Sequence, residues 1–252
     1  MKTDGDKFLF KLPELYRAKV IKRPSATCKS PYVADVHLIV DGVEKFTMAH
    51  APALGCAGLC DKGATVLLSK LEKKTKTSVC EYRIELAETK EKTIVGINPK
   101  LAEKIVEEGI MKSEMTKSYK REKTILNSRF DFVGCGSNGK NFVLEVKTVP
   151  LLVEPKVAFF PHGYRKKKGD AVSPRALKHL NDLIQISQES DADAMMCYVI
   201  QREDADSFVP SETDPIYKAK FYEAKEAGVV MKNLYVKWSE QGECFMRDYR
   251  DY

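Results

Sequence analysis

The stretch RFDFVGCGSNGKNFVLEVKTV, residues 129–149, consists of two apolar runs around a short turn that contains Asn138 and Gly139. Two such runs around a glycine-containing turn predict a β-hairpin. Three charged residues, Asp131, Glu145 and Lys147, interrupt the apolar pattern. A charged side chain in an apolar strand is costly to bury unless it is paired or holds a metal. The hairpin therefore has either a solvated charged face or an active site.

The length of the hairpin turn decides between these two interpretations. Glu145 and Lys147 share one face of their strand, because successive side chains point to opposite sides. A two-residue turn of Asn138 and Gly139 would place Asp131 on the other face. A three-residue loop that includes the preceding serine, with Gly139 left-handed, would instead pair Asp131 with Glu145. The three charges gather in that second register alone.

Gathered in this way, the three residues suit a metal-dependent phosphodiesterase. Two neighbouring carboxylates repel each other, and a divalent cation such as Mg²⁺ or Mn²⁺ relieves the repulsion. We expect Asp131 and Glu145 to bind the metal, and Lys147 to orient water or neutralise charge on a phosphate. An Asp, a hairpin and Glu-x-Lys form the core of the PD-(D/E)xK nucleases. Glu-x-Lys alone is also common as a solvated cross-strand pair, so the bland interpretation stays open here.

The composition narrows the class of protein. The chain has 252 residues, 43% of them apolar and 31% charged, which is typical of a soluble globular protein of one or two domains. A formal charge of +6 is a mild excess, compatible with an anionic partner. No apolar run approaches the roughly 20 residues of a membrane span, and the first residues have no signal-peptide pattern. The run GCGSNG lies in the predicted hairpin and not before a helix, which argues against a dinucleotide site.

Seven cysteines stand at irregular spacings, at positions 28, 56, 60, 80, 135, 197 and 244. An odd number without a regular framework argues against a disulfide-stapled secreted protein, and we expect a reducing cytoplasmic compartment. Cys56 and Cys60, with His50 nearby, are three candidate zinc ligands. Their spacing is not a common zinc motif, so burial of the cysteines as small hydrophobic residues is the favoured interpretation.

The hydrophobic pattern changes near residue 95. Before it, short alternating runs such as YVADVHLIV and CEYRIELAE predict strands, and we expect an OB-like β-barrel over residues 1–95. After it, the pattern predicts a helix, the hairpin, a second helix, a strand, a third helix and a final strand. Residues 96–252 are therefore expected to form an α/β domain with a mixed sheet flanked by helices, and the whole chain a two-domain α/β (α+β) protein.

Several segments resemble the sugar fermentation stimulation protein (SfsA) family. They follow the family order over roughly residues 15 to 238: YVADVHL, HAPALGCAGL, KKTKTSVCEYRIEL, REKTILNSRFDF, LEVKTVPL, DAVSPRALKHLNDL and DPIYKAKFYEAKEAGVVMKNLYV. The resemblance implies an N-terminal OB-like domain joined to a PD-(D/E)xK nuclease-like domain. It also implies non-specific DNA binding, with RNA not distinguished, and a link to the regulation of sugar use.

The resemblance assigns roles to individual residues. Asp131 and Glu145 would be metal ligands and Lys147 the catalytic lysine. Glu122 matches the acidic residue that such nucleases carry before the hairpin, and its bland interpretation is a surface carboxylate. Arg129 lies in the matched S-R-x-D-F segment and would contact a phosphate.

Further basic residues are candidates for contacts with the nucleic-acid backbone. Arg175, Lys178 and His179 lie three and four apart in a predicted helix, so they are expected to share one face; a solvated basic face is the alternative. The segment 162–169 interrupts the family's FPDA motif and adds a charge run next to the expected site. The candidates in this insertion and in the N-terminal domain are Arg165, Lys166, Lys167, Lys168, Lys73, Lys74 and Lys76.

The N-terminal domain also departs from the family pattern. Family members read close to HCPNTGxMxG where this chain reads HAPALGCAG, so Ala53 and Leu54 replace an Asn-Thr pair. Aromatic residues of the barrel, Tyr32, Phe46 and Tyr82, are either core residues or platforms for base stacking.

Two functions remain in competition. One is a Mg²⁺-dependent nuclease, and the other is a non-catalytic, sequence-nonspecific DNA-binding regulator on a nuclease-like scaffold. Carboxylates that face phosphate would weaken binding unless a metal intervenes, which favours the first.

Overall fold

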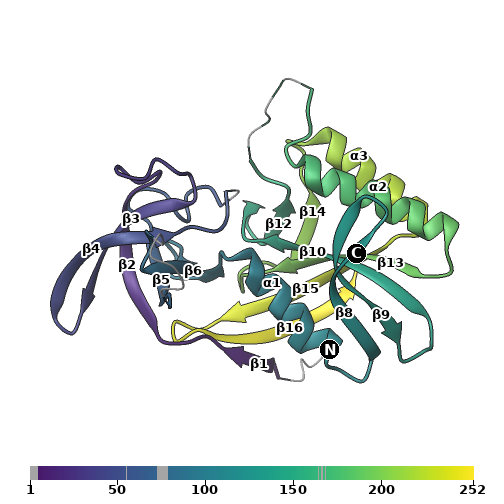
Figure 1. Cartoon of the computed structure of the whole chain (residues 1–252), viewed down its shortest axis with the longest axis horizontal. Helices are drawn as coiled ribbons and strands as arrows, with labels where there is room; N and C mark the ends of the chain where they lie inside the picture. The colour runs from purple at the N-terminus through teal and green to yellow at the C-terminus, as the bar shows by residue number, and fades with distance from the viewer. Residues whose placement is uncertain (1–4, 55, 73–78, 164, 166, 168) are drawn as a thin grey trace.

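The computed structural model of the protein describes residues 5–54, 56–72, 79–163, 165, 167 and 169–252. Two main β-sheets lie side by side, a barrel-like sheet from the first part of the chain and a helix-flanked mixed sheet from the remainder (Figure 1). Five of the candidate basic residues lie outside the described residues: Lys73, Lys74, Lys76, Lys166 and Lys168. The predicted two-part α/β architecture is confirmed.

The N-terminal sheet forms the expected OB-like barrel. Its strand order is β4-β3-β2-β5-β6-β7, and a parallel pairing of Ala49 with Tyr82 joins β4 to β6 and closes it. Small and β-branched residues fill its core, and the buried Cys56 and Cys60 lie among them as hydrophobic residues. The strands are β2 (Leu15–Lys22), β3 (Val33–Val40), β4 (Val43–His50), β5 (Thr65–Lys70), β6 (Tyr82–Glu88) and β7 (Ile94–Gly96).

The second sheet has seven strands in the order β1-β16-β15-β13-β10-β9-β8. Its centre is parallel, because β10, β13 and β15 run in one direction, and both flanks are antiparallel. A small third sheet of β11, β12 and β14 lies beside it. The strands are β1 (Lys7–Lys11), β8 (Thr116–Ile125), β9 (Ser128–Gly136), β10 (Asn141–Val149), β11 (Leu152–Glu154), β12 (Val157–Phe160), β13 (Asp193–Ile200), β14 (Ser207–Pro210), β15 (Val230–Trp238) and β16 (Glu243–Asp251).

Helices cover both faces of the seven-stranded sheet. The helix α1 (Pro99–Val106), extended by a π-helical turn (Glu107–Met111), packs on one face, and α2 (Pro174–Glu189) and α3 (Pro215–Glu226) pack on the other. Each helix begins with a capping side chain followed by proline, a sequence that favours a helix start. No helix in the described part of the chain is long and apolar enough to cross a membrane.

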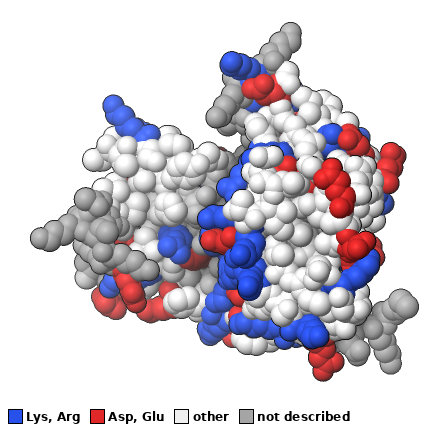
Figure 2. All heavy atoms as spheres, turned by 45° about the vertical axis from the view of Figure 1, so that its right-hand side comes forward, with Lys and Arg blue, Asp and Glu red and all other residues white. Residues whose placement is uncertain are grey.

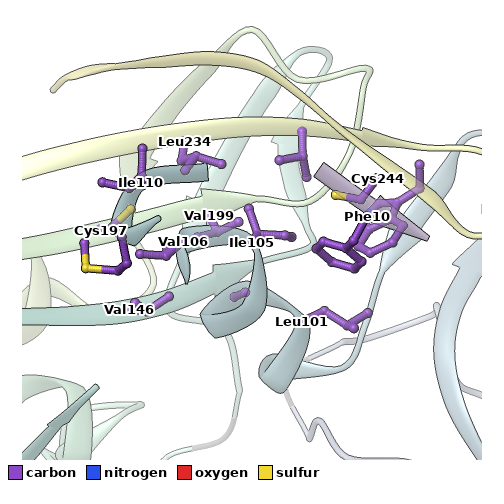
Figure 3. Packing of buried hydrophobic residues seen from close by; sticks show 14 of the residues in the cluster. Phe10, Leu101, Ile105, Val106, Ile110, Val146, Cys197, Val199, Leu234 and Cys244 are labelled. Atoms are coloured by element: carbon purple, nitrogen blue, oxygen red, sulfur yellow. The ribbon is translucent and has the colours of Figure 1, made fainter. Parts of the chain in front are cut away.

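A continuous core joins the barrel to the mixed sheet. Leu101 and Ile105 of α1 belong to one buried cluster with Val146 of β10 and Leu234 of β15 (Figure 3), and Leu86 of the barrel belongs to the same cluster. The N-cap of α1, Asn98, donates to the buried carboxylate of Glu85 in β6 at 2.7 Å. The helix is therefore held from the barrel side as well as from the sheet.

One strand differs from the expected division into residues 1–95 and 96–252. The strand β1 lies in the first part of the chain, yet it pairs with β16, with Lys7 opposite Met246. Phe10 of β1 is buried in the core of the second sheet, where its ring lies 5.7 Å from that of Trp238. Burial of this aromatic side chain against a distant part of the chain explains why the sequence pattern near residue 95 missed the contact.

A candidate metal and nucleic-acid site between barrel and sheet

The hairpin of β9 and β10 has the register that gathers its charges. Phe132 lies opposite Leu144, and Gly136 pairs with Lys140 across a three-residue loop in which Gly139 has a φ of 81°. This is the bulged turn that the sequence favoured for a site. Continuation of the register brings Asp131 opposite Glu145.

The left-handed Gly139 gives a first prediction. Nothing lies within 4 Å of a Cβ added at this position, so Gly139→Ala introduces backbone strain and no clash. We expect a loss of about 1 kcal/mol in the free energy of unfolding, measured by urea denaturation. Gly139→Asn is the matched control and should cost less, because Asn tolerates this backbone conformation. Equal stability of the Gly139→Ala variant and the unchanged protein would contradict the strain argument.

Asp131 stands where the two strands separate. The pairing of β9 with β10 ends at Phe132, and the Val146 N–H donates to the Asp131 carboxylate at 2.8 Å. The Asp131 side chain thus takes the place of the next backbone hydrogen bond between β9 and β10, and the two strands separate at this carboxylate. Burial raises the pKa of Asp131 to about 7, and the negative charge of Glu145 adds to this effect.

Glu145 lies in the middle of β10 and is 2% exposed. Its Oε1 contacts both the Lys147 ammonium and Nδ1 of His179, and Lys147 Nζ lies 3.2 Å from the same ring nitrogen. Burial alone would raise the pKa of Glu145, but Lys147 and His179 together outweigh burial and lower it. The second oxygen, Oε2, is buried without a hydrogen-bond partner among the described residues. An ionised carboxylate with a free oxygen therefore faces the carboxyl group of Asp131.

These groups line a cavity of about 560 Å³ between the barrel and the mixed sheet. Besides the hairpin charges, Arg129 and Arg175 line it, as do Lys100 and Glu103 of α1. Figure 2 shows Lys and Arg side chains gathered beside the hollow between the two parts of the molecule. The cavity thus combines an acidic centre with a basic margin.

The expected acidic partner, Glu122, lies at the edge of this arrangement. Its side chain is 42% exposed and forms ion pairs with Lys100 at 3.3 Å and with Arg129 at 3.6 Å. Glu122 is absent from the described lining of the cavity, whereas Glu103 of α1 belongs to it. Sequence reasoning missed Glu103, because Glu107 and Glu108 follow it closely and nothing in their spacing distinguishes one of the three.

For the expected basic face of α2, the structure contradicts His179, whereas Arg175 and Lys178 stay predictions. Arg175 lines the cavity, but His179 is 3% exposed and contacts Glu145, so it is not available to a nucleic-acid backbone. Lys178 donates to the carbonyl of Asn127, away from the described lining of the cavity. Three- and four-residue spacing places side chains on one side of a helix, but it does not say which of them meets the sheet.

The inserted segment is described at Arg165 and Lys167. Arg165 donates to the carbonyl of Thr213 at 2.5 Å, and Lys167 is exposed. Neither belongs to the described lining of the cavity. Among the basic candidates that the structure describes, Arg129 and Arg175 are therefore the two that line the cavity with the acidic centre.

The half-buried Asp131 and the buried Glu145 fit a divalent cation. Mg²⁺ is usually held by one or two carboxylates, with water and substrate phosphate as further ligands. Such an ion would bind the free Oε2 of Glu145 and relieve the repulsion between Glu145 and Asp131. No group of three or more His, Cys, Asp or Glu residues in the described ranges is placed to hold a metal by itself.

Comparisons with known proteins agree with this fold. The model of the sugar fermentation stimulation protein RE domain matches residues 96–242. A sugar fermentation stimulation protein homolog from Acetivibrio thermocellus is 36% identical over 221 residues, which is 86% of each chain. The homolog from Bartonella tribocorum is 32% identical, over 86% of this chain and 87% of its own.

A solved structure has the same fold. Pyrococcus furiosus SfsA, in complex with Ca²⁺, superposes with a TM-score of 0.78 and 22% sequence identity, covering 96% of this chain and 97% of its own. The matched family model, the relatives and the shared fold lead to one conclusion: this chain belongs to the sugar fermentation stimulation protein family.

Proposed function

We propose that this protein is a nucleic-acid-binding phosphodiesterase that cleaves DNA with Mg²⁺ or Mn²⁺. Asp131 and Glu145 would hold the cation, and Lys147 would assist the attacking water. The observation that carries the proposal is the pair of neighbouring carboxylates, the half-buried Asp131 and the buried Glu145 with its free oxygen, in a cavity with a basic margin. A bound divalent cation would polarise the phosphodiester and lower the pKa of a coordinated water.

The side chains around the carboxylates have separate tasks. His179 contacts Oε1 of Glu145 from the α2 side, and Oε2 is left without a hydrogen-bond partner among the described residues. Lys147 contacts the same carboxylate and can neutralise charge that develops on the phosphate. Arg129 and Arg175 would bind flanking phosphates, since guanidinium groups match phosphate oxygens in pairs.

Two further observations support this proposal. The P. furiosus relative was solved with Ca²⁺, a cation that takes oxygen ligands as Mg²⁺ does. Cys56, Cys60, Cys197 and Cys244 are buried as thiols in the described part of the chain, which supports a reducing cytoplasmic setting.

The alternative is a protein that binds DNA without cleaving it. Its difficulty is electrostatic, because buried carboxylates facing a phosphate lower affinity unless a cation lies between them. The proposal therefore favours catalysis, and experiment separates the two.

The test measures cleavage of a supercoiled plasmid and a labelled single strand in Mg²⁺, Mn²⁺ or EDTA. We expect cleavage in either metal and none in EDTA. Glu145→Ala should remove it, which also excludes a contaminating nuclease. Glu154→Ala is the matched control, since it removes an exposed carboxylate of β11. Tight binding without cleavage in any metal would overturn the catalytic proposal and leave a DNA-binding protein.

A further inference from the structure

The barrel supplies one wall of the cavity that holds the acidic centre. Tyr32, Pro52 and Leu54 line it from the barrel side. Tyr32 is 43% exposed and Leu54 55% exposed, so two large, mainly apolar side chains are open to solvent next to buried charges. A surface of this kind is unusual inside a charged cavity and suggests a ligand with an apolar face.

Two hydrogen bonds hold the backbone of Tyr32. The Ala51 N–H donates to the Tyr32 carbonyl at 2.8 Å, and the Tyr32 N–H donates to Ser30 Oγ at 3.3 Å. The loop before β3 is therefore tied to the residue that follows β4. On an anchored backbone, a tyrosine has only two side-chain torsions to order when a ligand packs on its ring.

The other aromatic residues of the barrel lack this placement. Tyr82 is 2% exposed and belongs to the barrel core. Phe46 is 69% exposed, but its ring stacks on His37 at 4.5 Å and lines a different, smaller groove. Tyr32 is thus the aromatic side chain of the three that meets the acidic centre.

The size of the cavity limits what reaches the carboxylates. A volume of about 560 Å³ is in the range of sites that enclose one small ligand, about 300–1,000 Å³. In duplex DNA the bases are stacked and paired, and the major groove alone is about 12 Å wide. A single strand can enter nucleotide by nucleotide, with each base free to leave its neighbours and stack on an aromatic ring.

We propose that the barrel wall makes this a site for single-stranded nucleic acid, in which an unpaired base stacks on Tyr32 while its phosphate faces Asp131 and Glu145. Cleavage of the strand at that phosphate rests on the proposed function, whereas the stacking of a base on Tyr32 does not. Arg129 and Arg175 hold the backbone on the sheet side, so base and phosphate separate onto the apolar and charged walls of one cavity.

The test measures binding of a fluorescent oligonucleotide by anisotropy, in EDTA and in Ca²⁺. We expect the protein to bind a single strand more tightly than the same sequence as a duplex. Tyr32→Ala should weaken single-strand binding about 5- to 150-fold, the range that corresponds to loss of one stacked base. Tyr32→Phe should keep most of the affinity, and Phe46→Ala, a matched exposed aromatic, should change it less than twofold.

A strand with abasic sites separates stacking from an effect on folding. Without bases, the unchanged protein and Tyr32→Ala should bind equally weakly. If Tyr32→Ala binds the normal strand as tightly as the unchanged protein, or if its defect persists on the abasic strand, the inference is wrong. A preference for duplex would also overturn it.

The binding readout does not depend on cleavage, so the two proposals fail separately. If Tyr32→Ala binds the single strand more weakly and the unchanged protein cleaves DNA in no metal, the proposed catalysis is wrong and the single-strand site stands. Cleavage in Mg²⁺ with no effect of Tyr32 would do the reverse.

Discussion

Replacing Lys147 by alanine is expected to slow metal-dependent cleavage of DNA about 10²- to 10³-fold while cation binding persists. The lysine side chain is 10% exposed and contacts Glu145 beside His179. Because Lys147 is largely shielded from water, its positive charge would stabilise charge that develops on the phosphate more strongly than an exposed lysine would. The variant keeps both carboxylates, so the loss should appear in the rate of the chemical step.

Single-turnover cleavage at saturating Mn²⁺ measures this step. Lys147→Arg should keep part of the rate, because it retains the charge with a different shape. Lys140→Ala is the matched control: this lysine lies just before β10 and pairs at 2.7 Å with Asp193 at the surface. Its rate should stay within about twofold of the unchanged protein. An undiminished rate in Lys147→Ala would mean that the lysine is structural and that catalysis, if present, uses another group.

In metal-free buffer, Asp131→Asn is expected to increase the free energy of unfolding at pH 8, by at most about 4 kcal/mol. The pKa of Asp131 is about 7 in the folded protein, against an ordinary value of 3.8. The folded state therefore holds this proton more tightly than the unfolded chain does. Its contribution to stability is complete below about pH 4 and is lost as the pH rises through 7. The asparagine variant has no proton to lose.

Urea unfolding at several pH values in EDTA checks the sign. The variant and the unchanged protein should agree near pH 4 and diverge up to pH 8. Ca²⁺ should raise the free energy of unfolding of the unchanged protein at pH 8 and raise that of Asp131→Asn much less. The reason is that bound Ca²⁺ relieves the repulsion between Asp131 and Glu145, which the substitution has already removed. Asp193→Asn, which loses a surface carboxylate, should show neither effect. A parallel pH dependence of the two proteins would show that Asp131 is not held protonated by the fold.

The hairpin and the shared face of Glu145 and Lys147 were predictable, because the strand period and the glycine-containing turn are local features of the sequence. The register was left open, because a two-residue turn also accepts a left-handed Gly139. The structure has the three-residue loop, which brings Asp131 opposite Glu145. The barrel and the flanking helices were predictable for the same reason, since alternation and helical stripes extend over neighbouring residues.

The sequence pattern did not predict how the helices pack against the sheet and the barrel. Whether α2 directs His179 or Lys178 toward the sheet depends on how the helix is rotated over β10. Whether Glu103 or Glu122 meets the cavity depends on the packing of α1, which is anchored through Asn98 to the barrel. Side-chain period cannot supply these long-range relations. The pairing of β1 with β16 is the extreme case.

That pairing also bears on how the protein is made. Ribosomes deliver the chain from its first residues onward, and the barrel strands can assemble as soon as they emerge. The mixed sheet must wait, because β1 has no neighbour until β16 has left the ribosome. During synthesis Phe8 and Phe10 lie on an unpaired edge, a kind of segment that invites association with other chains. Closing so long a loop is also slow. The mixed sheet is therefore completed only after β16 has been synthesised, and until then the nascent chain exposes a strand edge of the kind that chaperones shield.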